Sequence, residues 1–209
     1  MSDIDPGTPA NGGLSALTAR REPLNPRLPM GTAILNFEAR RDKRGHLVVY
    51  RLPPNDGGGS YEVAGINDRY HPDQAGKLRR LVDAGRYKEA EAAAANYLLA
   101  YTDRARTWSS RLGVEFFLRD SIFNRGPKGA ARILQRALGV RDDGVVGPVT
   151  KAALDAYSGD ILTQLRWARE DYEREVVGYR PKFWNGLVNR WNKALATARE
   201  FEQQEKSNG

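Results

Sequence analysis

Three acidic residues in the first third of the chain could perform acid–base chemistry: Glu38, Asp56 and Glu62. Glu38 ends an apolar stretch, residues 31–38, that has the pattern of a short helix. Apolar surroundings favour the protonated form of a carboxyl group, which is the form that a general acid needs. A second carboxylate nearby completes the minimum equipment for cleaving a glycosidic bond. The sequence therefore predicts Glu38 as a general acid and leaves open whether Asp56 or Glu62 is its partner.

Each of these acids also has an ordinary structural interpretation. Glu38 could be a surface acid that pairs with Arg40 or Arg41. Asp56 is followed by three glycines, which is typical of a turn. A pair of carboxylates about 5 Å apart indicates a retaining mechanism and one roughly 6.5 to 9.5 Å apart an inverting mechanism. The sequence leaves both mechanisms open.

The elements that must position these acids begin with a β-hairpin directly after the first helix, which is expected to end near Arg41. Residues 46–51 and 60–66 have the imperfect alternation of two strands, and the segment 53–59 between them is rich in proline and glycine. This hairpin is expected to carry Asp56 and Glu62.

The rest of the chain is expected to be helical. No segment recurs at a fixed period, so a helical-repeat protein is not favoured. The pairs Gly126-Pro127 and Arg180-Pro181 are expected to separate neighbouring helices. The fold class is therefore α+β, mainly α, with one small hairpin. Apolar residues at helical spacing predict seven helices, at about residues 72–85, 86–105, 112–124, 130–138, 149–157, 160–177 and 182–202.

The length of 209 residues fits one domain with tails. Residues 1–29 are rich in Pro, Gly and Asn and are expected to form a disordered arm, and residues 203–209 a disordered tail. The chain has no cysteine and two histidines, so disulfides, thiolate chemistry and a histidine-rich metal site are not expected, and no cofactor is implied.

The net charge of +7 attracts the chain to polyanions in general, such as nucleic acid or anionic cell wall. No zinc finger, recognition helix or aromatic–basic pattern of a nucleic-acid binder is present in the sequence. No apolar run is long enough to span a bilayer. The first residues lack the pattern of a secretory signal.

Four segments, in order, resemble the family-108 glycoside hydrolases, which are lysozyme-like muramidases also described as secretion-activating proteins. Phe37-Glu38-Ala39-Arg40 stands where that family has the Glu-Gly-Gly-Tyr motif of its catalytic acid. Residues 56–67 look like an elongated form of the family's glycine-rich turn, which ends in Tyr-Gly-Ile. The resemblance covers about Ala33 to Leu195 and is more specific from Asp120 onward. The matched segments of that later part are Asp120, Asn124-Arg125-Gly126-Pro127, Leu134-Gln135, Asp143-Gly144 through Gly147-Pro148 to Thr150, and residues 183–190.

The resemblance implies a lysozyme-like domain over residues 30–202, with a catalytic portion at 30–110 and a peptidoglycan-binding-like helical portion at 111–202. Its fold would be a multi-helix bundle with the hairpin at the active-site cleft. Its activity would be that of an N-acetylmuramidase, which cleaves the β-1,4 bond between N-acetylmuramic acid and N-acetylglucosamine. The implied substrate-binding residues are Tyr61, Asn67, Asp120 and Asn124.

The implied partners are peptidoglycan glycan strands and a secretion apparatus or phage holin, without nucleic acid, and the chain is expected to be a monomer. It would be made in the cytoplasm without a classical signal peptide and act at the periplasm or cell wall.

The chain departs from the family at three positions. Ala39 and Arg40 replace two glycines, and Glu62 aligns with a threonine. These departures motivate a second hypothesis, a catalytically impaired peptidoglycan-binding or scaffold protein on the same fold. A third hypothesis is a basic helical nucleic-acid binder.

Several matched residues have structural interpretations. Helix capping would account for Asn67, Asp120 and Asn124. The segment from Asp143-Gly144 to Gly147-Pro148 is interpreted as turn and helix-start chemistry. Trp184 and Trp191 are expected in the core.

Overall fold

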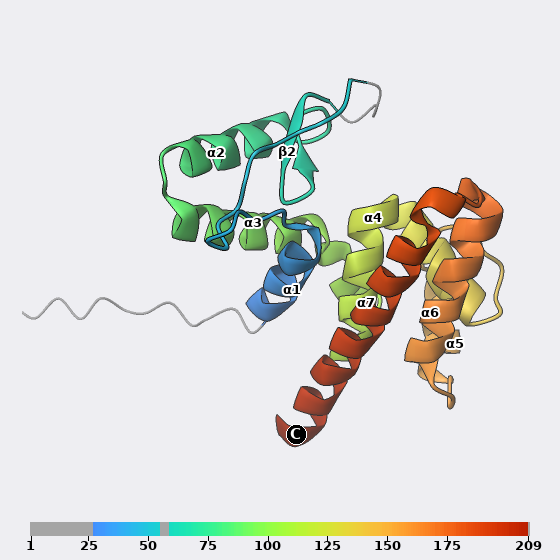
Figure 1. Cartoon of the computed structure of the whole chain (residues 1–209). Helices are drawn as coiled ribbons and strands as arrows, with labels where there is room; N and C mark the ends of the chain where they lie inside the picture. The colour runs from blue at the N-terminus through green and yellow to red at the C-terminus, as the bar shows by residue number, and fades with distance from the viewer. Residues whose placement is uncertain (1–26, 55–58, 209) are drawn as a thin grey trace, which may run out of the picture.

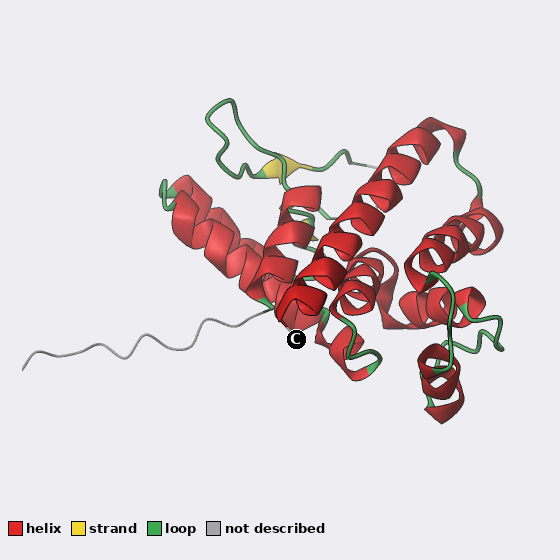
Figure 2. Cartoon of the chain, turned by 90° about the horizontal axis from the view of Figure 1, so that it is seen from below, coloured by secondary structure: helices red, strands yellow, loops and turns green. Residues whose placement is uncertain are grey.

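The computed structural model describes residues 27–54 and 59–208 (Figure 1). This part of the chain is mainly helical with one small antiparallel sheet, as the sequence predicts. Helices and loops account for most of the molecule in Figure 2. The elements, in order, are α1 (Leu28–Glu38), β1 (Tyr50–Arg51), β2 (Tyr61–Val63), β3 (Ile66–Asn67), α2 (Pro72–Asp83), α3 (Tyr87–Tyr101), a 3₁₀ helix (Asp103–Thr107), α4 (Leu112–Ala137), α5 (Pro148–Asp155), α6 (Ile161–Tyr172), a π-helical segment (Glu173–Gly178) and α7 (Pro181–Asn208).

Helix α1 packs closely against α3 and presents Glu38 at its C-terminal end. Proline in its first turn suits the start of a helix. Gly31 allows the close approach, because a Cβ there would lie 2.3 Å from the carbonyl oxygen of Ala95. The helix ends at Glu38, three residues before the predicted end near Arg41, because Ala39 is extended.

Over the described residues, the predicted hairpin region is a small sheet of three strands, one more than the sequence predicts. Strands β1 and β2 pair across the glycine-rich segment, and β2 then pairs with β3 across a two-residue turn, Ala64-Gly65. Both turn residues have positive φ, 55° and 72°, as a type I′ turn requires. The sequence predicts one strand over residues 60–66. In the structure the turn divides this segment between β2 and β3. The expected strand 46–51 is reduced to β1 and one isolated bridge between Arg41 and Leu47.

Helix α4 packs against α6 and α7 and is bent where the sequence predicts a break. Gly126 has φ 68° and ψ 169°, and Pro127 begins the second half of the helix. The non-helical backbone of Gly126 thus divides α4 into two helical segments, residues 112–125 and 127–137, which correspond to the two helices predicted here.

The turn before α5 has the structural role that the sequence predicts. Pro148 is the first residue of α5, and Gly144 has φ 81°. Gln135 of α4 binds this turn: its Nε2 donates to Asp143 Oδ1 at 2.7 Å, and its Oε1 accepts from the Gly144 amide at 2.8 Å. The matched segments 134–135 and 143–150 are thus parts of one hydrogen-bonded unit.

The last helix is longer than predicted. Helix α7 continues to Asn208, so residues 203–208 are helical and the predicted disordered tail is wrong there. Two contacts explain the extension: Glu202 pairs with Arg111 at 2.7 Å, and Glu205 accepts from the Leu112 amide at the start of α4. At the other end α1 already includes residues 28 and 29, and the remainder of the predicted arm, 1–26, lies outside the described residues.

In Figure 1, α1–α3 and the strands lie on one side of the molecule and α4–α7 on the other. Over residues 27–54 and 59–208, no helix has the length and apolar character needed to cross a bilayer.

Candidate functional site

Glu38 lies where three elements from distant parts of the chain meet. Its Oε1 accepts from Arg190 Nη2 of α7 at 2.7 Å and from Asn124 Nδ2 of α4 at 3.4 Å. The Glu38 side chain keeps 19% of its surface exposed. The structure therefore brings together two predicted site residues, Glu38 and Asn124, and pairs Glu38 with Arg190 rather than with Arg40 or Arg41.

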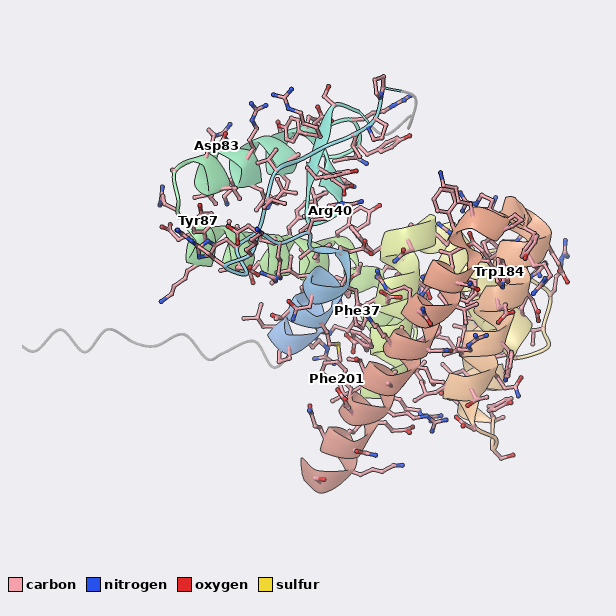
Figure 3. All side chains as sticks on the ribbon, viewed as in Figure 1. Phe37, Arg40, Asp83, Tyr87, Trp184 and Phe201 are labelled. Carbon is pink, nitrogen blue, oxygen red and sulfur yellow. The ribbon has the colours of Figure 1, made fainter. Side chains whose placement is uncertain are left out.

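Arg190 belongs to this site although the sequence predicts no role for it. It closes the matched segment 183–190, which is the signal that could have identified it. Its Nη2 lies 2.5 Å from Asp120 Oδ1, and its guanidinium lies over the ring of Phe37, 4.8 Å from the centroid. Figure 3 shows Phe37 between α1 and the α4–α7 side. Burial lowers the pKa of Arg190, but Asp120 and Glu38 outweigh burial and raise the pKa above its usual value.

The buried carboxylate behind Arg190 is Asp120. It is fully buried on α4, and its Oδ2 lies 2.5 Å from Arg169 Nη1 of α6. Burial raises its pKa, but the charges of Arg190 and Arg169 together hold the pKa below its usual value. The prediction that Asp120 contacts substrate does not agree with this burial: Asp120 anchors Arg190 instead. Asp120 lies within α4 and not at its N-terminus, so helix capping does not account for this residue either.

The turn between β2 and β3 forms the other wall of the site. A Cβ at Gly65 would lie 3.2 Å from Glu38 Oε2 and 3.3 Å from Phe123 Cε1. A glycine backbone therefore approaches the acid from the turn, although the two residues after Glu38 are not glycines. One oxygen of Glu38 is bound by α4 and α7, and the other faces Gly65.

Glu62, one candidate for the second carboxylate, lies on the face of the sheet that it shares with Tyr50 and Asn67. Its Oε1 is 3.5 Å from Arg40 Nε, and the Arg40 guanidinium lies over the ring of Tyr50 at 3.7 Å. Figure 3 shows Arg40 beside the strands. The other candidate, Asp56, lies outside the described residues.

The remaining predicted ligands, Tyr61 and Asn67, make their contacts toward α2. Tyr61 lies on the opposite face of β2 from Glu62, with Arg79 of α2 at 5.0 Å from its ring centroid. Asn67 Oδ1 accepts from the Tyr70 amide at 3.0 Å in the turn before α2. The structural interpretation of Asn67 as a local cap therefore agrees with its hydrogen bond.

Two further features bear on what the site can hold. Among the described residues, no cluster of three His, Asp or Glu side chains is arranged to hold a metal ion. A groove of about 590 Å³ lies between α2 and α3, where it is lined by Lys77, Arg80 and Arg86 among others. It includes none of the predicted site residues, so the carboxylate cluster at Glu38 is the better candidate for chemistry.

The fold and the site define a mainly helical protein in which a small strand-and-turn unit faces a helix bundle across a carboxylate–arginine cluster. No family model matches the chain, and no curated protein matches it. Among solved structures, SagA of Brucella abortus has the same fold, with a TM-score of 0.58 and 22% sequence identity. The match covers 84% of this chain and 93% of the SagA chain.

Proposed function

We propose that this protein is a peptidoglycan hydrolase of the N-acetylmuramidase type with Glu38 as its general acid. The observation that carries the proposal is the position of Glu38: a partly exposed carboxylate held by Arg190 and Asn124 where α1, α4 and the β2–β3 turn meet. The fold shared with Brucella abortus SagA and the resemblance of the sequence to family-108 glycoside hydrolases both support it.

In this reaction Glu38 protonates the glycosidic oxygen as the bond to the anomeric carbon breaks. The carboxylate that remains is negatively charged, and Arg190 stabilises this charge from 2.7 Å. Asp120 and Arg169 hold Arg190 in place from the buried side. A second carboxylate, Glu62 or Asp56, has one of two roles. It either takes a proton from water while the water oxygen bonds to the anomeric carbon, or it stabilises the oxocarbenium-like transition state.

The substrate under this proposal is the glycan strand of peptidoglycan, and the place of action is the periplasm or cell wall. The net charge of +7 favours association with an anionic wall.

The direct test is the loss of turbidity of purified peptidoglycan with the wild type and with Glu38→Gln. Because general acid catalysis contributes about 10²- to 10⁴-fold, the rate is expected to fall by at least about 100-fold. Glu91→Gln is the matched control, since Glu91 also pairs with an arginine, Arg41, but lies outside the site. Equal rates for the wild type and Glu38→Gln would remove the assignment of Glu38. Glu62→Gln and Asp56→Asn, measured separately, then identify the second carboxylate.

A second candidate function is a peptidoglycan-binding protein without turnover. Both described candidate carboxylates pair with arginines, Glu38 with Arg190 and Glu62 with Arg40, and this favours it. Co-sedimentation with insoluble peptidoglycan without release of reducing ends would support this function. Robust release of reducing ends by the wild type would eliminate it.

A further inference from the structure

A row of ring side chains begins beside Glu38 and has no part in the proposed reaction. It consists of Phe123 of α4, Tyr101 and Tyr97 of α3, and His71 just before α2, and we call it the aromatic row. The ring centroids of Phe123 and Tyr101 are 6.2 Å apart, and those of Tyr101 and His71 are 5.1 Å apart. Tyr97 and Tyr101 stack at 6.1 Å with 19° between their planes.

The aromatic row is continuous with the Glu38 site through the β2–β3 turn. The position of a Cβ on Gly65 is 3.2 Å from Glu38 Oε2 and 3.3 Å from the edge of Phe123. Phe123 also follows directly on Ile122 and precedes Asn124, the residue whose amide contacts Glu38. A chain of sugars bound at Glu38 that extends toward α3 would therefore meet the aromatic row first at Phe123.

The aromatic row is exposed to solvent at Tyr101, its central member. Tyr101 keeps 40% of its surface exposed, while Tyr97, Phe123 and His71 are partly buried. Tyr97 and Tyr101 are four residues apart on α3 and so share one face of that helix. An exposed tyrosine that packs on partly buried rings close to a reactive group is suited to a binding surface.

The aromatic row also contains a hydrogen bond between two of its members, and burial favours their uncharged forms. Tyr97 Oη and His71 Nδ1 share a hydrogen bond of 2.7 Å, which fixes both rings. Burial lowers the pKa of His71, which favours the neutral imidazole. Burial raises the pKa of the Tyr97 hydroxyl, which favours the neutral phenol. A neutral surface of ring faces with hydroxyl and imidazole groups at its rim suits a pyranose, whose C–H face packs on aromatic rings and whose hydroxyls form hydrogen bonds.

We propose that the aromatic row is a binding subsite for the sugar rings that adjoin the scissile bond, with Tyr101 as its central stacking residue. This proposal rests on the proposed action of Glu38 on a glycan strand. The aromatic row adds the direction in which the strand runs, from the β2–β3 turn over Phe123 to the C-terminal end of α3.

The test measures glycan binding without turnover. Soluble peptidoglycan glycan fragments of increasing length are titrated calorimetrically into Glu38→Gln and into the double variant that adds Tyr101→Ala. A lost stacking contact is expected to weaken the binding of long fragments by about 3- to 10-fold. The loss for the disaccharide is expected to be smaller, because a short ligand at Glu38 meets Phe123 but covers less of the aromatic row beyond it. Tyr101→Phe, which keeps the ring, should retain most of the affinity.

Trp167→Ala in the same Glu38→Gln background is the matched control, because Trp167 is an exposed aromatic residue on α6, away from the aromatic row. Thermal melting of each variant separates loss of binding from loss of folding, and Tyr97→Phe tests the hydrogen bond to His71 without removing a ring.

If Tyr101→Ala and Trp167→Ala bind long fragments equally well, the subsite is overturned even where Glu38→Gln abolishes hydrolysis. If Glu38→Gln still hydrolyses peptidoglycan, the assignment of Glu38 as the general acid fails, and the binding comparison alone decides whether the aromatic row holds sugar.

Discussion

The two sides of the molecule hold their charged groups in different ways. On the side of α4, α6 and α7, three carboxylates are almost completely buried and each is matched by arginine, in the pairs Asp120–Arg169, Glu115–Arg119 and Glu173–Arg125. This buried network lies beside exposed pairs such as Arg199–Asp160. On the side of α1, the strands, α2 and α3, ion pairs lie at the surface, as in Arg40–Glu62, Arg79–Asp83 and Arg86–Glu89. Removing one partner of a buried pair leaves an uncompensated charge in the interior, whereas exposed pairs contribute little.

The candidate site lies between these two sides of the molecule. Arg190 belongs to the buried network through Asp120, and it reaches Glu38, which comes from the other side. The buried network thus supplies the positive charge of Arg190, and α1 supplies the carboxylate of Glu38, which could exchange a proton. Substitutions on the two sides are therefore expected to differ in their effects. Those in the buried network of α4, α6 and α7 should lower stability, and those on the side of α1 and the strands should lower activity with little loss of stability.

The largest expected effect on stability is that of Asp120→Asn. It leaves Arg169 and Arg190 buried without their shared counter-charge, so the free energy of unfolding should fall by about 3 to 5 kcal/mol. Urea denaturation followed by circular dichroism measures this, with Glu91→Gln as the control for an acid in a more exposed pair. A loss below about 1 kcal/mol would mean that the network is not held together by its charges.

The same network predicts sensitivity to acid. The pKa of Asp120 in the folded protein lies below its usual value of 3.8, so its carboxylate stabilises the folded state above that pH. This contribution is lost as the pH falls below 3.8 and through the folded pKa, because Asp120 is then protonated. Melting temperatures measured from about pH 6 to about pH 2 should fall more steeply for the wild type than for Asp120→Asn. Parallel curves would contradict the lowered pKa.

An intermediate effect is expected at the β2–β3 turn, where Gly65→Ala can be compared with Gly45→Ala. Both glycines have positive φ, 72° and 84°, so each substitution should cost about 1 to 2 kcal/mol of stability. Of these two positions, only Gly65 has an added Cβ that crowds Glu38 and Phe123, since no atom of the described residues lies within 4 Å of the same position on Gly45. Hydrolysis of peptidoglycan should therefore fall by about 10- to 100-fold in Gly65→Ala alone. Equal activities would show that the turn does not border the reacting groups.

Local signals in the sequence were sufficient for most of the helices. Proline and glycine mark the start of α2, the kink of α4 at Gly126 and the start of α5 at Pro148, and each acts through its own backbone geometry. The position of Glu38 at the end of a short apolar helix was likewise predictable from residues 31–38. These features depend on neighbours a few residues away.

The features that the sequence did not predict depend on contacts between distant segments. The turn at Ala64-Gly65 places an alanine at positive φ, which sequence preferences disfavour. Arg190 and Asp120 meet only when α7 packs on α4, so neither the burial of Asp120 nor its role could be derived from spacing. The length of α7 depends on Glu205, which accepts a hydrogen bond at the start of another helix.

The smallest expected effect on stability is that of Arg40→Ala, on the exposed side. Arg40 pairs with Glu62 and covers Tyr50, but 56% of its side chain is exposed, so solvent screens both contacts. The free energy of unfolding should fall by no more than about 1 kcal/mol.

The informative measurement is the pH dependence of hydrolysis. If Glu62 is the second carboxylate, removing the neighbouring positive charge makes its proton harder to lose, and the acidic limb of the pH–rate profile moves to higher pH. Arg41→Ala, which removes an arginine paired with Glu91, should leave that limb in place. A profile that does not move in Arg40→Ala would count against Glu62 as the second carboxylate, and a loss of several kcal/mol would mean that the exposed pair behaves like the buried ones.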